Sequence, residues 1–376
     1  MSKDWNLFGL DDLGVLRFRG PDAVKFLQGQ LSNDVEKLSA ERAQLAGYHN
    51  PQGRVIALVR LVQWSADDIL AILPRELITT VASRLTKFVL RAKVKISDDS
   101  SGWRLTGLVA PHSSPVNGSG ALSAQESDAL AGAAMSWAAA QFASASAAVA
   151  ASAETSSAAA QLEEADSVVE LPEASAFMLP DGLNSQARSG ATAVIRVGTS
   201  PARWLILSPS EAPLPLSGCG LGDRDAWRLL DIADGVAQVY AATSEEFVAQ
   251  MLNLDTLEGI AFDKGCYTGQ EVIARAHYRG RVKRRMQRFF SRGTLKLAPG
   301  ESGQLVDGRT FKVVDAVQLA NGRCEFLAVA PLVAGSVEEA APAAAVAPSA
   351  VAPSAVVAAA VQVDAEALPL AYALPD

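Results

Sequence analysis

The chain has 376 residues, with 33 Lys and Arg against 41 Asp and Glu, which gives a formal net charge of −8 at pH 7. Its length predicts roughly two or three domains at about 100–200 residues each, and its acidity argues against bulk nucleic-acid binding unless basic residues gather locally. With three scattered histidines, three distant cysteines and no long apolar run or apolar leader, we expect a cytoplasmic protein with no metal site, no disulfide framework and no membrane segment.

The first part of the chain predicts mixed strands and helices. Residues 14–19 are expected to form a strand, and apolar side chains at helical spacing predict a helix over residues 21–31. The apolar, β-branched run at residues 54–64 is typical of a strand, and residues 50–53 before it are typical of a hairpin turn. A second helix is predicted over residues 74–89.

Two segments differ from the rest by composition. Residues 131–160 contain 16 Ala and 6 Ser in 30 positions without an apolar stripe, so we interpret residues 111–174 as a poorly ordered insertion. Residues 334–362 are rich in Ala and Pro and are typical of an extended linker. Because the apolar residues 368–374 that follow resemble a last strand, this linker is expected to be a loop within one domain.

The later part of the chain predicts first a helix and then strands. Thr243 and Glu246 have the spacing of a capping box, which predicts a helix over about residues 243–252. From residue 282 onward, short strands and glycine-rich turns predict a separate all-β domain.

The stretch from Asp263 to Gly280 is the most informative for chemistry. Thr268 and Glu271 have capping-box spacing and predict a helix over residues 269–280. The glycines at 265 and 269 would let the backbone pass close to a ligand or adopt a positive φ.

Cys266 precedes this predicted helix start, where unpaired amides favour an anion. Lys264 beside it, and Arg275 and Arg279 on the helix, would also lower a thiol pKa, so the pattern favours a reactive thiolate. The alternative is a small buried cysteine beside an ordinary turn.

Basic residues gather after the motif in a stretch that contains no Asp or Glu, residues 272–300. They are Arg275, Arg279, Arg281, Lys283, Arg284, Arg285, Arg288, Arg292 and Lys296. Such a run could attract RNA or a polyglutamylated ligand. It could equally be a solvated strand that protects a sheet edge.

The octapeptide at residues 264–271, followed by Arg275 and by Arg279-Gly280, resembles the signature of the YgfZ family. Members of that family are folate-binding relatives of the glycine-cleavage T-protein that support iron–sulfur proteins and tRNA modification. Residues 20–34, 52–54 and 252–255 agree with the resemblance, which covers most of residues 8–110 and 175–330.

The resemblance implies an α+β fold arranged as a T-protein-like ring of three domains, with tetrahydrofolate in a central channel. Residues 1–110 and 175–280 would form two α+β subdomains of an aminomethyltransferase-like folate-binding region. Residues 281–376 would form a C-terminal β-barrel that carries the loop 334–362.

The resemblance also implies the site residues. Cys266 and Lys264 would be catalytic, and the following residues would contact the cofactor: Trp227, Leu13, Gly265, Tyr267, Gly269, Gln270, Glu271, Arg275 and Arg279. Leu13 stands where the family has a second tryptophan.

The function implied is that of a tetrahydrofolate-binding protein supporting iron–sulfur cluster assembly or repair in client enzymes, including tRNA-modifying ones. One rival is a folate-dependent aminomethyltransferase, but residues 54–60 lack the carboxylate such enzymes carry on that strand. The other rival is a protein that contacts tRNA directly through residues 275–296.

Overall fold

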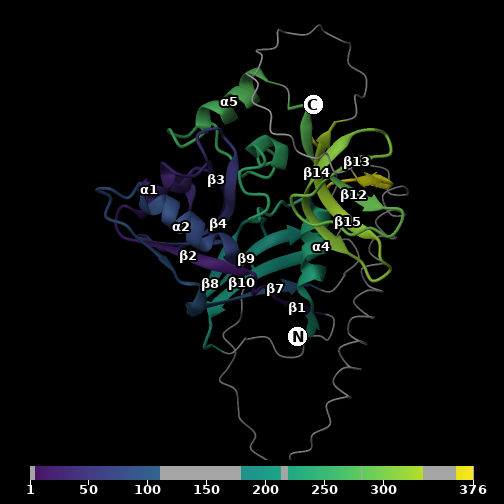
Figure 1. Cartoon of the computed structure of the whole chain (residues 1–376). Coiled ribbons are helices and arrows are strands. Elements are labelled where there is room, and N and C mark those ends of the chain that lie inside the picture. Colours follow the sequence, from purple (N-terminus) through teal and green to yellow (C-terminus); the bar gives the residue numbers. More distant parts are fainter. Residues whose placement is uncertain (1–4, 111–178, 213–218, 281, 333–360, 376) are drawn as a thin grey trace, which may run out of the picture.

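Three β-sheets and a few short helices make up the part of the chain that the computed structural model describes (Figure 1). The described residues are 5–110, 179–212, 219–280, 282–332 and 361–375. The predicted insertion at residues 111–174, and all but the end of the predicted loop at residues 334–362, lie outside them. None of the described helices is both long and apolar enough to cross a membrane.

The first sheet comes entirely from the N-terminal segment and is antiparallel. Its strand order is β3 (Gln44–His49), β4 (Val55–Ser65), β5 (Asp68–Pro74), β2 (Leu13–Arg19) and β6 (Lys95–Asp98). Side chains alternate between its faces. Leu16 and Phe18 join the core formed with the helices α1 (Ala23–Gln28) and α2 (Ile78–Thr86), whereas Val15 faces the second sheet. The predicted strands at residues 14–19 and 54–64 are therefore confirmed.

The second sheet combines strands from distant parts of the sequence. Its order is β11 (Gly220–Gly222), β1 (Asn6–Gly9), β7 (Trp103–Val109), β10 (Ala202–Pro209), β9 (Thr192–Thr199) and β8 (Gln186–Ser189), with β1 and β11 parallel. Helix α4 (Arg224–Asp234) follows β11. The side chain of Asp223 caps it by accepting a hydrogen bond from Ala226 N at 2.7 Å, and Gly235 ends it in the left-handed region.

The third sheet is a nearly closed barrel, as predicted for the C-terminal part. Its order is β16 (Val361–Val363), β13 (Ser302–Leu305), β14 (Thr310–Gln318), β15 (Cys324–Pro331), β12 (Arg284–Ser291) and β17 (Ala365–Leu368). Only Asp364 separates β16 from β17, yet these strands form opposite edges of the order. The sheet must therefore curl until its edges come close together.

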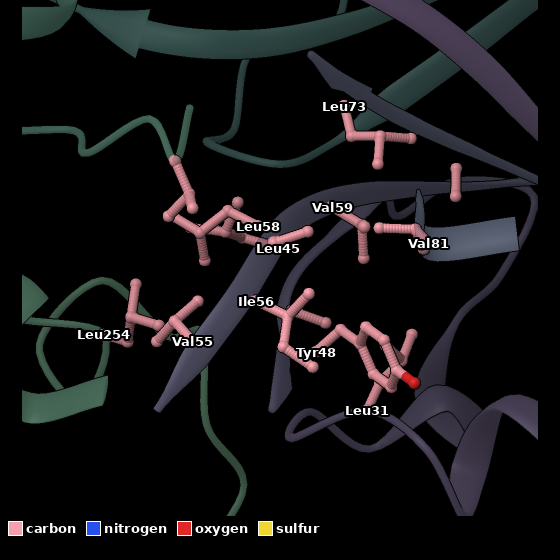
Figure 2. Close-up of a cluster of buried hydrophobic side chains, with 14 of the residues drawn as sticks. Leu31, Leu45, Tyr48, Val55, Ile56, Leu58, Val59, Leu73, Val81 and Leu254 are labelled. Atoms are coloured by element: carbon pink, nitrogen blue, oxygen red, sulfur yellow. The ribbon is translucent and has the colours of Figure 1, made fainter. Parts of the chain in front are cut away.

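One large apolar core joins the first sheet, α1, α2 and the segment before the motif. Figure 2 shows part of it, with Leu58 beside Leu45 on neighbouring strands and Tyr48 beside Leu31. The core places β3 and β4 against Leu254 and so fixes the chain that leads to residues 263–280.

Two sequence predictions of helices need correction. The helix over residues 243–252 was wrong for most of its length: Glu245 has a φ of 65°, which turns the chain, and only a 3₁₀ turn at Ala249–Leu252 follows. The helix over residues 74–89 divides into a 3₁₀ turn (Arg75–Leu77) and α2. The remaining 3₁₀ turns span Val35–Lys37 and Ser100–Gly102.

The predicted last strand at residues 368–374 was misplaced, since β17 ends at Leu368. Pro369 has no N–H to continue the ladder. The segment after it docks through Tyr372, whose hydroxyl donates a hydrogen bond to Gly235 O at 2.8 Å and accepts one from Asn253 Nδ2 at 3.1 Å.

Candidate functional site

A narrow cavity of about 70 Å³ lies where the first two sheets and α4 meet. Its lining residues are Leu10, Leu13, Leu45, Leu58, Arg60, Ile72, Val197, Leu205, Trp227, Asp231, Val236, Ala237 and Gln238. Leu13 and Trp227, which the resemblance paired as folate contacts, thus border the same space from distant parts of the sequence.

The indole ring of Trp227 packs against Phe8 and Gly107. Its ring centroid lies 5.7 Å from that of Phe8, and a Cβ added at Gly107 would come within 2.3 Å of the indole. Glycine at 107 therefore makes room for the ring. The indole is only 3% exposed, so it borders the cavity as a rigid wall.

Two charged residues that sequence reasoning missed also line the cavity. Asp231 accepts a hydrogen bond at 2.8 Å from Arg203, which is fully buried and also binds Asp234 at 2.5 Å. Arg60 of β4 donates from Nη1 to Asn184 Oδ1 at 2.7 Å, and burial lowers its pKa to about 10. The available sequence signal for Arg60 was a single charge within the otherwise apolar residues 55–62.

A larger cavity of about 560 Å³ adjoins the first one, because Leu45 lines both. Its walls are Asn33, Lys37, Arg42, Ala43, Gln44, Leu45, Asn184, Asp255, Glu258, Ile260, Ala261, Phe262, Asp263 and Tyr278. Its exposed basic side chains are paired, Lys37 with Asp263 at 3.5 Å and Arg42 with Glu258 at 3.0 Å.

The ammonium group of Lys264 is held by three backbone carbonyls and lies 5.0 Å from the centroid of the Tyr267 ring. Its Nζ donates hydrogen bonds to Gln28 O, Leu31 O and Asn33 O at 2.7, 2.7 and 2.8 Å. Burial lowers its pKa to about 8. Lys264 therefore ties the motif to the chain that follows α1, and a catalytic role for it stays a prediction.

Cys266 is exposed, and it lines neither of the two cavities. Next to it, Tyr267 is 8% exposed, and its ring centroid lies 6.2 Å from that of the buried His49. Within the described residues, no three His, Cys, Asp or Glu side chains are grouped as a metal site requires. The motif thus anchors Tyr267 in the core and leaves the thiol accessible.

Helix α5 (Gln270–Arg279) confirms the predicted helix but begins without the predicted capping box. Gly269 is the cap residue with a φ of 81°, and no side chain caps the helix. A Cβ at Gly269 would lie 2.5 Å from Asn50 O, whereas one at Gly265 would meet nothing within 4 Å. Of the two glycines, only the second is thus required by a positive φ and by a close contact.

Most predicted ligand residues on α5 face away from the core. Gln270 is half-buried, whereas Glu271, Arg275 and Arg279 are exposed, and only Ile273 of the helix is buried. The helix lies at the periphery of the molecule (Figure 1). None of the three exposed residues lines either cavity.

The basic run after α5 is divided by the fold. Arg285 is 4% exposed and forms two hydrogen bonds with Asp255, at 3.0 and 2.8 Å, and Arg288 pairs with Glu325 at 2.6 Å. Arg285 thus joins β12 to the segment at Asp255, Arg288 pairs within the barrel, and neither is available to RNA. Any polyanion contact is thereby restricted to the exposed part of the run.

No protein-family model matches the chain. It is 30% identical over 324 residues to the tRNA-modifying protein YgfZ of Pectobacterium carotovorum subsp. carotovorum (strain PC1), a match covering 84% of this chain and 80% of that protein. The protein of the same name from Serratia proteamaculans (strain 568) is 28% identical over 327 residues, covering 84% of this chain and 81% of the relative.

Among solved structures, the chain resembles the glycine cleavage system aminomethyltransferase T from Bartonella henselae. The TM-score is 0.56 at 12% identity, over 88% of this chain and 79% of that one. This likeness shows a T-protein-like fold. Together with the 30% identity to the Pectobacterium protein over most of both sequences, it establishes that the chain belongs to the YgfZ family.

Proposed function

We propose that the chain binds tetrahydrofolate and supports iron–sulfur cluster assembly or repair in client enzymes, and through them tRNA modification. The observation that carries the proposal is the convergence of Leu13 and Trp227 on one cavity that also holds Arg60 and Asp231. Curated relatives named tRNA-modifying proteins and the T-protein-like fold support it. We extend the proposal to a ring of three domains with the predicted boundaries, acting in the cytoplasm.

The polar side chains that line the cavity suit a pterin ring. A pterin presents N–H donors and a carbonyl acceptor along one edge, and the cavity offers the Asp231 carboxylate and the Arg60 guanidinium. Trp227 offers an aromatic wall. At about 70 Å³ the space is below the roughly 300–1,000 Å³ of ligand pockets, so binding requires apolar side chains such as Leu13 and Leu45 to move.

We propose that Cys266 is the residue that contacts the client enzymes. Bound folate would supply a carrier for one-carbon units, and this chain would supply an accessible thiol on a loop whose neighbours Lys264 and Tyr267 are anchored. A thiolate is the nucleophilic and metal-binding form of cysteine. An exposed thiol can reach a partner protein, whereas the buried Cys324 cannot.

Aminomethyl transfer is less well supported. Strand β4 carries no Asp or Glu along Val55–Ser65, and a carboxylate there would be needed to manage charge on a reacting amine.

Direct tRNA contact is a second candidate, favoured by the exposed face of α5. Arg275 and Arg279 are exposed and form no ion pair with a described carboxylate, and Tyr278 beside them is 67% exposed. Cationic and aromatic side chains together suit single-stranded RNA. Replacing both arginines with Gln should weaken tRNA binding and flatten its salt dependence, and unchanged binding would exclude this candidate.

The proposed function is tested by two variants in parallel. Trp227→Ala should weaken tetrahydrofolate binding by about 1–3 kcal/mol, the value of one stacked ring, and unaltered affinity would exclude this cavity. Cys266→Ser should lower iron–sulfur enzyme activity and tRNA methylthiolation together in cells under oxidative stress. Cys219→Ser is the matched control, since Cys219 lies at the edge of the second sheet. Full activity of the Cys266 variant would leave only the folate part of the proposal.

A further inference from the structure

Among the charged residues that line the cavity, Arg60 is the one whose charge has no ion-pair partner among the described residues. Its one hydrogen bond goes to Asn184 Oδ1, and it forms no ion pair with a carboxylate among the described residues. Burial lowers the pKa of its guanidinium to about 10. By accessible surface the residue is only half-buried, and the nearby Asp231 opposes the lowering of its pKa. A partly desolvated cation without an ion-pair partner is still costly, so an acceptor on a bound ligand would stabilise it.

Arg60 lines the cavity and keeps donors beyond the one that Asn184 accepts. The residue lines this space together with Trp227 and Leu13, and a guanidinium has five N–H donors, of which Asn184 uses one. An acceptor bound in the cavity would therefore lie beside a guanidinium that still has donors to offer.

The charges around the cavity favour a neutral acceptor. Arg203 is paired with both Asp231 and Asp234, so this cluster carries one net negative charge when its carboxylates are ionised. That charge offsets Arg60 without touching it. A ligand carboxylate would add a further negative charge, whereas a ring carbonyl would not.

We propose that Arg60 binds the ring carbonyl of the ligand and so selects a lactam-bearing ring, which rests on the proposed folate function. Asp231 lies on the same cavity and accepts from Arg203 with one oxygen only. It can accept from the N–H next to that carbonyl. Donor and acceptor together match a pterin edge, and Trp227 borders the ring.

The test compares the wild type with Arg60→Met and with a matched control, Arg19→Met. Arg19 lies on β2 of the same sheet with a side chain that is 61% exposed. Binding of tetrahydrofolate, of 6-methyltetrahydropterin as the ring fragment and of p-aminobenzoylglutamate as the tail fragment is measured anaerobically by calorimetry. Urea unfolding of each ligand-free protein is measured alongside.

We expect Arg60→Met to weaken tetrahydrofolate and the ring fragment by roughly 10- to 100-fold, the value of a charged hydrogen bond. The tail fragment and the Arg19 variant should be unaffected. The ligand-free Arg60 variant should be as stable as the wild type or more stable, because an apolar side chain replaces a charge that has no ion-pair partner. If Arg60 has only a structural role, Arg60→Met will instead lower the stability of the ligand-free protein and leave its affinity for tetrahydrofolate unchanged. That result would overturn the inference.

Two further outcomes separate the inference from the function on which it rests. Suppose that the wild type binds tetrahydrofolate and that Arg60→Met binds it equally well, or loses affinity for the tail fragment alone. The inference then fails and the proposed function stands. If the wild type binds neither tetrahydrofolate nor the ring, both fail. Should Arg60→Met not fold, Arg60→Lys decides: it keeps the charge but loses the planar fork, so we expect at least roughly 10-fold weaker ring binding, and unchanged binding overturns the inference.

Discussion

At the scale of single residues, the side chain of Lys264 joins two segments that are far apart in the sequence. Three backbone carbonyls between residues 28 and 33 converge on its ammonium group. Carbonyls that lose a donor while half-buried cost free energy. The charge of this lysine is therefore used to hold the motif in place.

Replacing Lys264 with Met should lower the free energy of unfolding by about 2–3 kcal/mol, because a charged donor to three carbonyls is lost. Urea unfolding followed by fluorescence measures the change. Lys37→Met is the control, since Lys37 is 61% exposed and its ion pairs lie at the surface. Equal stability of the two variants would mean that the carbonyl contacts contribute nothing net.

His49 predicts a pH dependence of stability. It is 1% exposed, neither ring nitrogen has a hydrogen-bond partner, and burial lowers its pKa to about 3. Between that value and about 6.5 the unfolded chain binds a proton that the folded chain does not, so stability falls as pH falls through this range. The contribution of His49 to the free energy of unfolding is therefore about 2 kcal/mol smaller at pH 5 than at pH 7.5.

His49→Leu should remove that part of the pH dependence. Urea midpoints at pH 7.5 and pH 5 provide the measurement. His277→Gln should retain the wild-type slope, because His277 is exposed. A His49 variant whose stability still falls as steeply toward pH 5 would assign the effect to other groups.

The thiols of Cys266 and Cys324 should react in an order set by burial. Cys266 is exposed, whereas Cys324 is fully buried and burial raises its pKa to about 11. Iodoacetamide at neutral pH should therefore modify Cys266 first and Cys324 only after unfolding, as read by mass spectrometry of peptides. Modification of Cys324 in the folded protein at a comparable rate would contradict this burial.

At the scale of elements, the start of α5 packs against the hairpin turn before β4. Gly269 lies against Asn50 O and Gly53 Cα, and Gly53 itself has a φ of 72° and lies against Val272. Two glycines with positive φ thus permit a backbone contact that side chains would prevent.

Gly269→Ala should destabilise the protein by about 1–3 kcal/mol, because the added methyl group meets backbone in a conformation that L-residues rarely adopt. Gly265→Ala is the matched control four residues earlier and should be nearly neutral, since its Cβ would meet nothing within 4 Å. Thermal unfolding of both variants gives the comparison. If the control loses as much stability as Gly269→Ala, the contact with the turn is not the cause.

The elements show what the sequence could and could not predict. An apolar, β-branched run located β4, and apolar side chains at helical spacing located α1. Helix α5 was predicted from a capping box that does not form, although the helix itself does. Capping-box spacing failed after Thr243, where the Thr243 hydroxyl accepts a hydrogen bond from Tyr240 N and Glu245 turns the chain. Spacing alone cannot distinguish a capping box from such a turn.

The candidate site was predictable only in part. Leu13 and Trp227 came from a resemblance and do line one cavity, but Arg60 and Asp231 join them through packing between sheets, which local patterns do not encode. Arg285 was grouped with surface cations because its partner Asp255 is 30 residues away in the sequence. Pairing of buried charges depends on tertiary structure.

At the scale of the whole molecule, one buried ion pair joins α4 to the barrel. Arg228 Nη2 binds the carboxylate of Asp315, which is 2% exposed and also accepts from Tyr240 Oη at 2.9 Å. Burial raises the pKa of Asp315, and Arg228 opposes that rise. The barrel is thus attached to the cavity-bearing helix through charge.

Arg228→Met should cost about 3–5 kcal/mol, because it leaves a buried carboxylate without its cation. The double variant Arg228→Met/Asp315→Leu should regain much of that loss, since no uncompensated charge remains. Calorimetric unfolding of the single and double variants tests this. A double variant that is no more stable than Arg228→Met would show that shape, and not charge, joins the two parts.

The closure of the barrel also bears on how the protein is made. Strands β16 and β17 complete opposite edges of the sheet, yet they follow every other described strand in chain order. Synthesis proceeds at roughly 5–20 residues per second. Until residues 361–368 leave the ribosome, β12 and β13 each have one unpaired edge. A ribosome that stalls before that point releases a chain with two open strand edges, which are templates for aggregation.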